Sequence, residues 1–311
     1  AVRCPTGRRI GRRPAGCASG IAPGAHLIAA MNWTTLISAE ELAHAIDRCV
    51  LVDCRHRLDD PQAGRRAWEA GHIPSAHFLS IDDDLSGRHD PSLGRHPLPD
   101  REALRSKLAA LGLSDDTQLV VYDDQGGAMA GRLWMLARWL GHRHVALLDG
   151  GIAAWQRAGY PMSTEAPAPA TPGHLSERPT LVTLLNTAQL MAALQDGHSQ
   201  IVDARPAERF QGKDTSMDPV AGHIPGAINR PLSQNLRPDG RFKPAEVLRH
   251  EWETLLAGRK PEDIIQQCGS GITANHNLLS MELAGLPGSR LYPPSWSGWI
   301  SDPSRPVAKG E

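Results

Sequence analysis

The segment Cys268–Thr273 reads Cys-Gly-Ser-Gly-Ile-Thr, and its residue types and spacing have the clearest capacity for chemistry in the chain. Gly269 and Gly271 let the backbone curl so that successive N–H groups point inward, which makes a loop that attracts an anion. A cysteine sulfur held in such a loop is favoured as the thiolate, the nucleophilic form of the side chain. The alternative is a buried cysteine beside a turn. The two glycines and the flanking elements favour the reactive interpretation of Cys268.

The elements on either side place this loop between a strand and a helix. The apolar pair Ile264 and Ile265 leads into it, and helix-forming residues follow from 274 to 283, with Gly285 as a C-cap. The N-terminus of that helix adds partial positive charge to the loop. We therefore expect strand, tight loop and helix, with the cysteine where an anion is best stabilised.

The order of motifs in the first half of the chain returns in the second half. Val-Asp-Cys-Arg at 52–55 corresponds to Val-Asp-Ala-Arg at 202–205, and Gly-His-Ile-Pro-Ser-Ala at 71–76 corresponds to Gly-His-Ile-Pro-Gly-Ala at 222–227. The stretch 161–180 between the halves has the composition of a linker. Short apolar strands alternate with helical stretches, so we expect an α/β fold of two tandem copies, each a parallel sheet flanked by helices.

The two copies differ at the reactive position. Aligning their loops places Asp124 opposite Cys268. A carboxylate cannot act as the sulfur nucleophile, so only the second copy is expected to catalyse. Because binding clefts favour domain interfaces, we expect the first copy to supply a wall of the site.

Together, the cysteine loop and the two pairs of repeated motifs resemble the rhodanese-like sulfurtransferases over nearly all of residues 36–307. The form of the loop is similar to that of the mercaptopyruvate branch of the family. The resemblance implies a non-catalytic rhodanese-like domain at 34–160, a linker at 161–180 and a catalytic domain at 181–308. Six charged or imidazole side chains of the repeated motifs are expected to be structural because both copies have them: Asp53, Arg55, His72, Asp203, Arg205 and His223.

The resemblance also implies an activity. Enzymes of this branch move sulfane sulfur from 3-mercaptopyruvate to a small thiol, a thioredoxin-like protein or cyanide through a persulfide, which here would form on Cys268. Neither a metal nor an organic cofactor is expected. A thiosulfate sulfurtransferase and a non-catalytic interaction module remain alternatives. A cysteine-based phosphatase is disfavoured because it requires an arginine six residues after the cysteine, where this chain has Ala274.

The resemblance assigns Arg209, within Glu-Arg-Phe, to the anionic donor. A guanidinium group suits this task because it offers a planar fork of hydrogen-bond donors. The alternative is a surface arginine paired with an acid. The mercaptopyruvate branch usually has a second arginine before the second Gly-His-Ile-Pro motif, and the only cation of this chain there is Lys213, whose role stays open.

Further contacts with the donor are implied around the cysteine. His96, within His-Pro-Leu-Pro, would lie near the donor, and Asp82 would form a relay with Cys268 and Ser270. The alternative for Asp82 is a solvated run of acids. The hydroxyl of Thr273 would donate to the sulfur. The expected donor-binding residues of the loop are Gly269, Gly271, Ile272 and Thr273.

Composition limits the partners of the protein. The net charge is −1 and the isoelectric point is near 7.0, which gives no electrostatic reason to expect nucleic acid or an anionic membrane. No apolar run is long enough to cross a bilayer. The five cysteines show neither a zinc-site spacing nor an even number, which favours free thiols in a reducing compartment, the cytoplasm.

Residues 1–30 differ from the rest because they contain five arginines and no acid. We expect a disordered extension here, since nothing in it predicts a packed core. A transit peptide or twin-arginine signal is one interpretation. The other is upstream sequence before a natural start at Met31.

Overall fold

The computed structural model describes residues 33–195 and 197–310. The expected extension at 1–30 lies outside this part of the chain. Both sheets described below belong to one unit, Asn32–Glu311. Within the described residues, no helix is long and apolar enough to cross a membrane.

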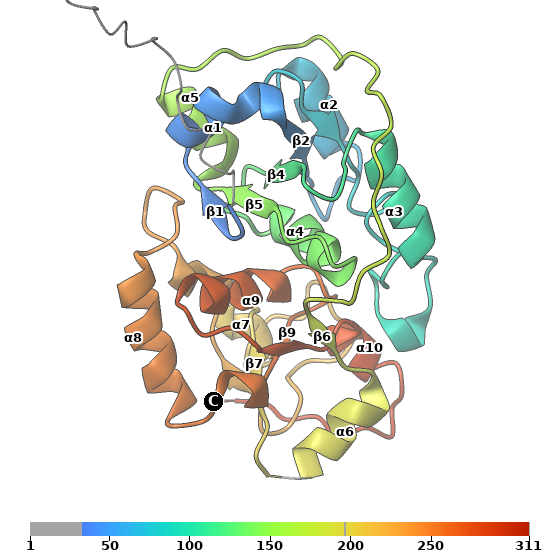
Figure 1. The fold of residues 1–311 in the computed structure, drawn as a ribbon. Helices are drawn as coiled ribbons and strands as arrows, with labels where there is room; N and C mark the ends of the chain where they lie inside the picture. The colour runs from blue at the N-terminus through green and yellow to red at the C-terminus, as the bar shows by residue number, and fades with distance from the viewer. Residues whose placement is uncertain (1–32, 196, 311) are drawn as a thin grey trace, which may run out of the picture. The chain divides into compact units, whose positions relative to one another are not determined.

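The first half forms a five-stranded parallel sheet with the strand order β1-β5-β4-β2-β3 (Figure 1). Its strands are β1 (Leu36–Ile37), β2 (Cys49–Asp53), β3 (His77–Phe78), β4 (Gln118–Tyr122) and β5 (Val145–Leu148). Its helices are α1 (Ala39–Ala45), α2 (Ala63–Ala70), α3 (Arg101–Ala110), α4 (Ala130–Trp139) and α5 (Gly151–Arg157), with short 3₁₀ turns η1 (Ile46–Arg48) and η2 (Pro91–Leu93).

The second half repeats this architecture with the strand order β6-β10-β9-β7-β8. The equivalent order confirms the predicted α/β fold of two tandem copies. The strands are β6 (Thr183–Leu184), β7 (Gln200–Asp203), β8 (Ile228–Asn229), β9 (Ile264–Gln267) and β10 (Arg290–Leu291). The helices are α6 (Thr187–Gln195), α7 (Ala207–Phe210), α8 (Ala245–Leu256), α9 (Ala274–Leu283) and α10 (Ser295–Trp299), with 3₁₀ turns η3 (Leu232–Asn235) and η4 (Pro261–Asp263).

The paired strands show that the predicted alignment of the two loops is wrong by one residue. Asp53 pairs with Tyr122 in the first sheet, and the equivalent Asp203 pairs with Gln267 in the second. The next residue along each strand is therefore Asp123 in the first copy and Cys268 in the second. Asp123, not Asp124, occupies the cysteine position. Two consecutive aspartates made the strand end ambiguous in the sequence.

The Asp–Arg pairs of the repeated motifs form the same contacts in both copies. In the first, Arg55 forms an ion pair of 2.6 Å with Asp53 and donates to the carbonyl of Gly71 at 2.7 Å. The equivalent distances in the second copy are 2.7 and 2.9 Å. The arginine thereby ties a strand end to the turn of the Gly-His-Ile-Pro motif, which fits the structural role expected of these residues.

The helices that follow the two loops, α4 and α9, pack against each other at the junction of the copies. All residues of α9 from Ala274 to Met281 are buried, which explains why this helix has no polar stripe in the sequence. One hydrophobic cluster contains residues of both sheets and of both helices. The cysteine loop, at the start of α9, is consequently held against the first copy.

Candidate active site

Cys268 lies at the carboxyl end of β9, directly before the loop that opens α9. Its sulfur accepts a hydrogen bond from the backbone N–H of Gly271 at 3.2 Å, and its own N–H donates to Ser295 Oγ at 3.1 Å. The hydroxyl of Ser295 also lies 3.8 Å from the sulfur. Only 1% of the residue is exposed. The sulfur is therefore surrounded by hydrogen-bond donors and shielded from water.

Gly271 has a structural requirement for glycine. Its φ is +84°, and a Cβ at this position would lie 2.3 Å from the carbonyl oxygen of Pro293. A side chain would therefore push the loop off the segment that precedes α10. The tight turn is what brings the N–H of Gly271 to the sulfur.

In the first copy, the loop surrounds the buried carboxylate of Asp123; burial raises the pKa of this carboxyl, and backbone hydrogen bonds act in the opposite direction. The carboxylate of Asp123 accepts four backbone hydrogen bonds, from Gln125, Gly127, Met129 and Ala130, at 2.8–2.9 Å. This buried carboxylate fills the loop of the first copy from within. In the second copy the sulfur of Cys268 occupies the corresponding place.

A buried cation, Arg132 of α4, supports the cysteine loop from the first copy. It is completely buried and donates to the carbonyl of Gly271 at 3.0 Å. Its other donors bind the carbonyls of Leu85, His96 and Pro97 at 2.9–3.3 Å. Burial lowers the pKa of Arg132 to about 10, although the electrostatic interaction with Cys268 acts in the opposite direction. The sequence analysis missed this residue, although an arginine within an apolar helix was a visible signal.

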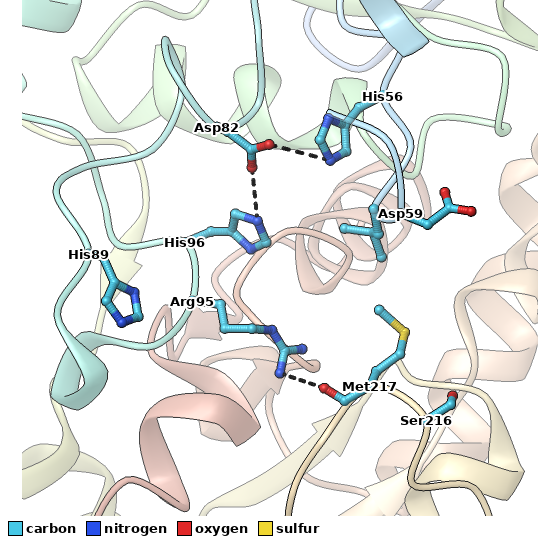
Figure 2. A pocket seen from close by; sticks show the side chains of 9 residues that line it. His56, Asp59, Asp82, His89, Arg95, His96, Ser216 and Met217 are labelled. Carbon is cyan, nitrogen blue, oxygen red and sulfur yellow. Dashed lines mark hydrogen bonds and ion pairs between the residues drawn. The ribbon is translucent and has the colours of Figure 1, made fainter. Parts of the chain in front are cut away.

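Asp82 lies against two histidines, as Figure 2 shows. Its carboxylate is 3.2 Å from His96 Nε2 and 4.0 Å from His56 Nε2. Burial lowers the pKa of His96 to about 4, although Asp82 acts in the opposite direction, so the imidazole is neutral at pH 7. His96 Nδ1 is buried and has no hydrogen-bond partner. His56, which the sequence analysis missed, has a pKa lowered by burial as well.

The predicted relay of Cys268, Ser270 and Asp82 has no direct link in the structure. Among the hydrogen bonds of the described residues, none joins Asp82 to Ser270; the carboxylate faces His96 instead. The hydroxyl of Thr273 was also predicted to donate to the sulfur. Among the hydrogen bonds of the described residues, the backbone N–H of Gly271 does so instead. Ser270 and Ile272 are buried within the loop, and Thr273 directly precedes α9.

Arg209, the predicted donor-binding residue, lies beside the loop and has an acidic partner. Asp218 bridges it to Arg95 of the first copy, at 2.5 Å to Arg209 Nη2 and 2.6 Å to Arg95 Nη1. A Cβ on Gly269 would lie 2.8 Å from Arg209 Nη2 and 3.4 Å from Arg95 Nη2. Two guanidinium groups therefore reach the residue next to the cysteine. Lys213 is exposed and belongs to none of the ion pairs found among residues 33–195 and 197–310.

A pocket of about 730 Å³ opens beside these residues. Both copies contribute to it: His56, Asp82, Arg95 and His96 from the first, and Met217 from the second (Figure 2). The charged side chains of this lining are Arg95 and two carboxylates, Asp59 and Asp82, and apolar side chains such as Leu58 and Met217 complete it. Cys268 and Arg209 are not among the residues that line it. Within the described part of the chain, no group of three or more His, Cys, Asp or Glu residues is arranged to hold a metal ion.

Comparison with known proteins agrees with this architecture. A protein of Pseudomonas aeruginosa named "Probable 3-mercaptopyruvate sulfurtransferase" is 45% identical over 90% of this chain and 100% of its own length. A Mycobacterium tuberculosis protein named "Putative thiosulfate sulfurtransferase SseB" is 37% identical over 88% of this chain and 97% of its own. The crystal structure of SseA from Escherichia coli, a 3-mercaptopyruvate sulfotransferase, matches with a TM-score of 0.71 and 31% identity over 84% of this chain and 98% of that one.

The family assignment rests on both halves of the chain. Residues 38–158 and 186–302 each match the rhodanese-like domain family. The first range runs from α1 to α5 and the second from α6 to α10, so that the edge strands β1 and β6 lie just outside the matched residues. The protein is thus a member of the rhodanese-like sulfurtransferase family, with two rhodanese-like domains in tandem.

Proposed function

We propose that the protein is a sulfurtransferase that takes sulfane sulfur from 3-mercaptopyruvate and passes it to a thiol or cyanide through a persulfide on Cys268. The observation that carries this proposal is the cysteine loop itself. Its backbone donates to the sulfur of Cys268, and the equivalent loop of the first copy binds a carboxylate with four N–H groups. A loop of this kind stabilises a sulfur anion as an oxyanion hole stabilises an oxyanion.

In the first half-reaction, the thiolate of Cys268 attacks the sulfur of the donor. An S–S bond forms as the C–S bond breaks, and the electron pair of the C–S bond moves to the carbon as an enolate. The proton of the donor thiol moves to that carbon, which yields pyruvate and the persulfide anion. We assign the relay of this proton to His96, because it lines the pocket, its ring is neutral and its Nδ1 has no hydrogen-bond partner.

In the second half-reaction, an acceptor thiol or cyanide takes the outer sulfur. For a small thiol or a thioredoxin-like protein, the acceptor forms the new S–S bond while the bond to Cys268 Sγ breaks and the thiolate returns. No oxidant, metal or organic cofactor takes part in either step.

Thiosulfate is the second candidate donor, and one observation favours it. Two arginines, Arg95 and Arg209, lie next to Gly269, and a compact dianion is attracted to paired cations. In this version the S–S bond of thiosulfate breaks and sulfite leaves with the electron pair. We expect mercaptopyruvate to be preferred, because Asp218 compensates one of these charges.

Two measurements test the proposal. With both donors compared side by side, we expect kcat/KM to be at least about tenfold higher for mercaptopyruvate, the value of one charge-assisted contact. Intact mass spectrometry should show one added sulfur atom on the wild type and none on Cys268→Ser. Cys49 and Cys54 serve as internal controls, because burial raises the pKa of Cys49 to about 11 and that of Cys54 well above its usual range. Sulfur on either of them, or an active Cys268→Ser protein, would refute the mechanism.

We also propose the division of labour between the domains. Residues 34–160 form the non-catalytic domain, 161–180 the linker and 181–308 the catalytic domain. Asp123 at the cysteine position supports a non-catalytic first domain, because a carboxylate cannot carry sulfane sulfur. The odd number of cysteines and their spacing fit free thiols in a reducing compartment, and we propose the cytoplasm.

A further inference from the structure

An ion-pair bridge between the two domains lies next to the nucleophile. Asp218 joins Arg95 of the first domain to Arg209 of the second with distances of 2.6 and 2.5 Å. Arg95 also donates to the carbonyl of Met217 at 3.2 Å (Figure 2). The Nη2 atoms of both arginines approach Gly269, the neighbour of Cys268. The cations of this bridge are thus placed to meet a ligand that reaches the sulfur.

The backbone around Arg95 is tied to the catalytic loop. Its N–H donates to Ser297 Oγ at 3.0 Å, and the N–H of Ser297 donates to the carbonyl of Gly269 at 2.9 Å. Gly94 has a φ of +87°, and a Cβ there would lie 2.5 Å from the carbonyl of Pro294. The side chain of Arg95 is nevertheless 32% exposed and lines the 730 Å³ pocket. Arg95 therefore combines an anchored backbone with an accessible cation.

Among the groups that these ion pairs join, one positive charge is in excess. Asp59 and Asp82, which line the pocket with Arg95, and Asp214, which interacts with Arg209, lie outside the bridge. A third guanidinium, Arg205, lies 3.6 Å from Asp218 but is already paired with Asp203 at 2.7 Å. Three guanidinium groups thus face two carboxylates. Burial raises the pKa of Asp218, but hydrogen bonds from Arg209 and Arg95 outweigh this effect and hold the pKa below its usual range. Asp218 is therefore ionised at neutral pH.

We propose that Arg95 is the second donor-binding cation of this site, and that Asp218 selects donors with a single negative charge by leaving the bridge with a net charge of one. This inference rests on the sulfurtransferase function proposed above. Arg95 takes the role for which the second domain offers only the exposed Lys213. The carboxylate of the sulfur donor accepts hydrogen bonds from the guanidinium N–H groups that Asp218 leaves free. These include Arg95 Nη2 and the buried Nε of Arg209, which has no hydrogen-bond partner.

The first test concerns Arg95, with Lys213→Gln as the matched control. We expect Arg95→Gln to raise KM for mercaptopyruvate by about ten- to a hundredfold with kcat within about threefold, because the contact is with the non-reacting carboxylate. Arg95→Lys should have a KM between those of Arg95→Gln and the wild type, since lysine keeps the charge but not the planar pair of N–H donors. The KM and kcat of Lys213→Gln should stay within about twofold of the wild-type values. An unchanged KM in Arg95→Gln, or an equal loss in Lys213→Gln, would overturn the assignment.

A binding assay separates this inference from the proposed function. Pyruvate should protect Cys268 from alkylation by iodoacetamide, and Arg95→Gln should need about ten times more pyruvate for the same protection. This readout requires no turnover. If the wild type transferred sulfur from neither donor, the proposed function would fail while the protection assay still decided the role of Arg95. Equal protection in both proteins would refute that role.

The second test concerns Asp218 and the charge of the donor. Asp218→Asn keeps the shape and raises the net charge, so the ratio of kcat/KM for thiosulfate to that for mercaptopyruvate should rise at least about tenfold. Asp218→Glu should keep the wild-type ratio. The double variant Arg95→Gln/Asp218→Asn restores a net charge of one and should return the ratio toward that of the wild type. If Asp218 had a purely structural role, Asp218→Asn would lower kcat/KM for both donors equally. An unchanged ratio of the two kcat/KM values in Asp218→Asn would contradict the proposal.

Discussion

At the scale of single residues, the loop of the proposed nucleophile is held by a cation that is completely buried. Arg132 holds the carbonyl of Gly271, and the N–H of the same residue donates to Cys268 Sγ. No carboxylate pairs with Arg132 among the ion pairs of the described chain, and the electrostatic interaction with Cys268 raises the pKa of Arg132 against the effect of burial. A buried positive charge stabilises a nearby anion far more than a solvent-exposed positive charge does. We therefore propose that Arg132 positions the cysteine loop and that its charge stabilises an anion that forms on Cys268 during the reaction.

We expect Arg132→Gln to lower kcat/KM by roughly ten- to a hundredfold, the value of a charge-assisted interaction. The pH profile of Cys268 alkylation by iodoacetamide should move to higher pH, because less thiolate forms without the charge. Arg132→Lys keeps the charge but not all four hydrogen bonds, so it should lose thermal stability while it retains most of the alkylation rate. If both variants lost stability equally and neither changed the alkylation profile, the role of Arg132 would be structural only.

The sequence revealed the residues that belong to recognisable motifs and missed those that act through folding. Cys268 and Arg209 stand in short motifs with their own chemistry, so they could be predicted. Arg95 lies in a loop, and its partners Asp218 and Ser297 are more than a hundred residues away. Arg132 binds only backbone carbonyls, which leave no signal in side-chain identity. Long-range contacts of this kind appear only when the two domains are packed.

At the scale of elements, strand ends and caps could be predicted, whereas the position of one loop residue could not. The pattern of a capping box is visible in the sequence as Ser38 with Glu41 and as Asn186 with Gln189. In the structure, Ser38 and Glu41 form reciprocal bonds of 3.2 and 2.9 Å, and Asn186 with Gln189 forms the equivalent pair in the second domain. The loop of the first domain was misaligned by one residue because either of two aspartates could follow the strand. Only the pairing register of β4 identifies Asp123.

Helix α9 carries a buried imidazole that makes stability depend on pH. His276 Nε2 donates to the carbonyl of Gly126 at 3.0 Å, and its Nδ1 accepts from Asn235 Nδ2 at 3.1 Å, which only a neutral ring can do. Burial lowers the pKa of His276 to about 4, although the bond to Gly126 opposes this effect. In the unfolded chain the pKa is about 6.5. Between these values the unfolded state binds a proton that the folded state does not, so stability falls as the pH falls.

We therefore expect the melting temperature to drop steeply from pH 6.5 to 4, with His276 alone accounting for up to about 3 kcal/mol of unfolding free energy. His276→Gln can still donate to Gly126 but takes up no proton, so its melting temperature should vary less over this range. His250→Gln changes an exposed histidine and serves as the control. A slope in His276→Gln equal to that of the wild type would show that other groups carry the acid sensitivity.

At the scale of the whole molecule, the two domains share one core and one site. Helices α4 and α9 cover each other, and Arg138 pairs with Glu282 across their contact at 3.0 Å. The segment between the domains runs along α3 (Figure 1). It is bound to this helix by the N–H of Gly173, which donates to the carbonyl of Ala109 at 2.7 Å. The composition of this segment predicted a linker but not its packing, because backbone bonds of this kind do not depend on side-chain type.

The shared core predicts that the catalytic domain cannot work alone. Residues 181–311 without the first domain lose the apolar cover of α9 together with Arg95, His96 and Arg132, so we expect less than about 1% of the intact activity, as the loss of several charge-assisted contacts implies. Adding residues 33–180 in trans should restore part of it. The matched control is the full chain with a protease site inserted after Ala168, an exposed position of the linker, and cut only after folding. The cut protein should keep its activity, because both domains stay packed through α4 and α9. An isolated second domain with near-intact kcat/KM for either donor would mean that the first domain contributes no wall of the site, and the roles of all three first-domain residues would fail with it.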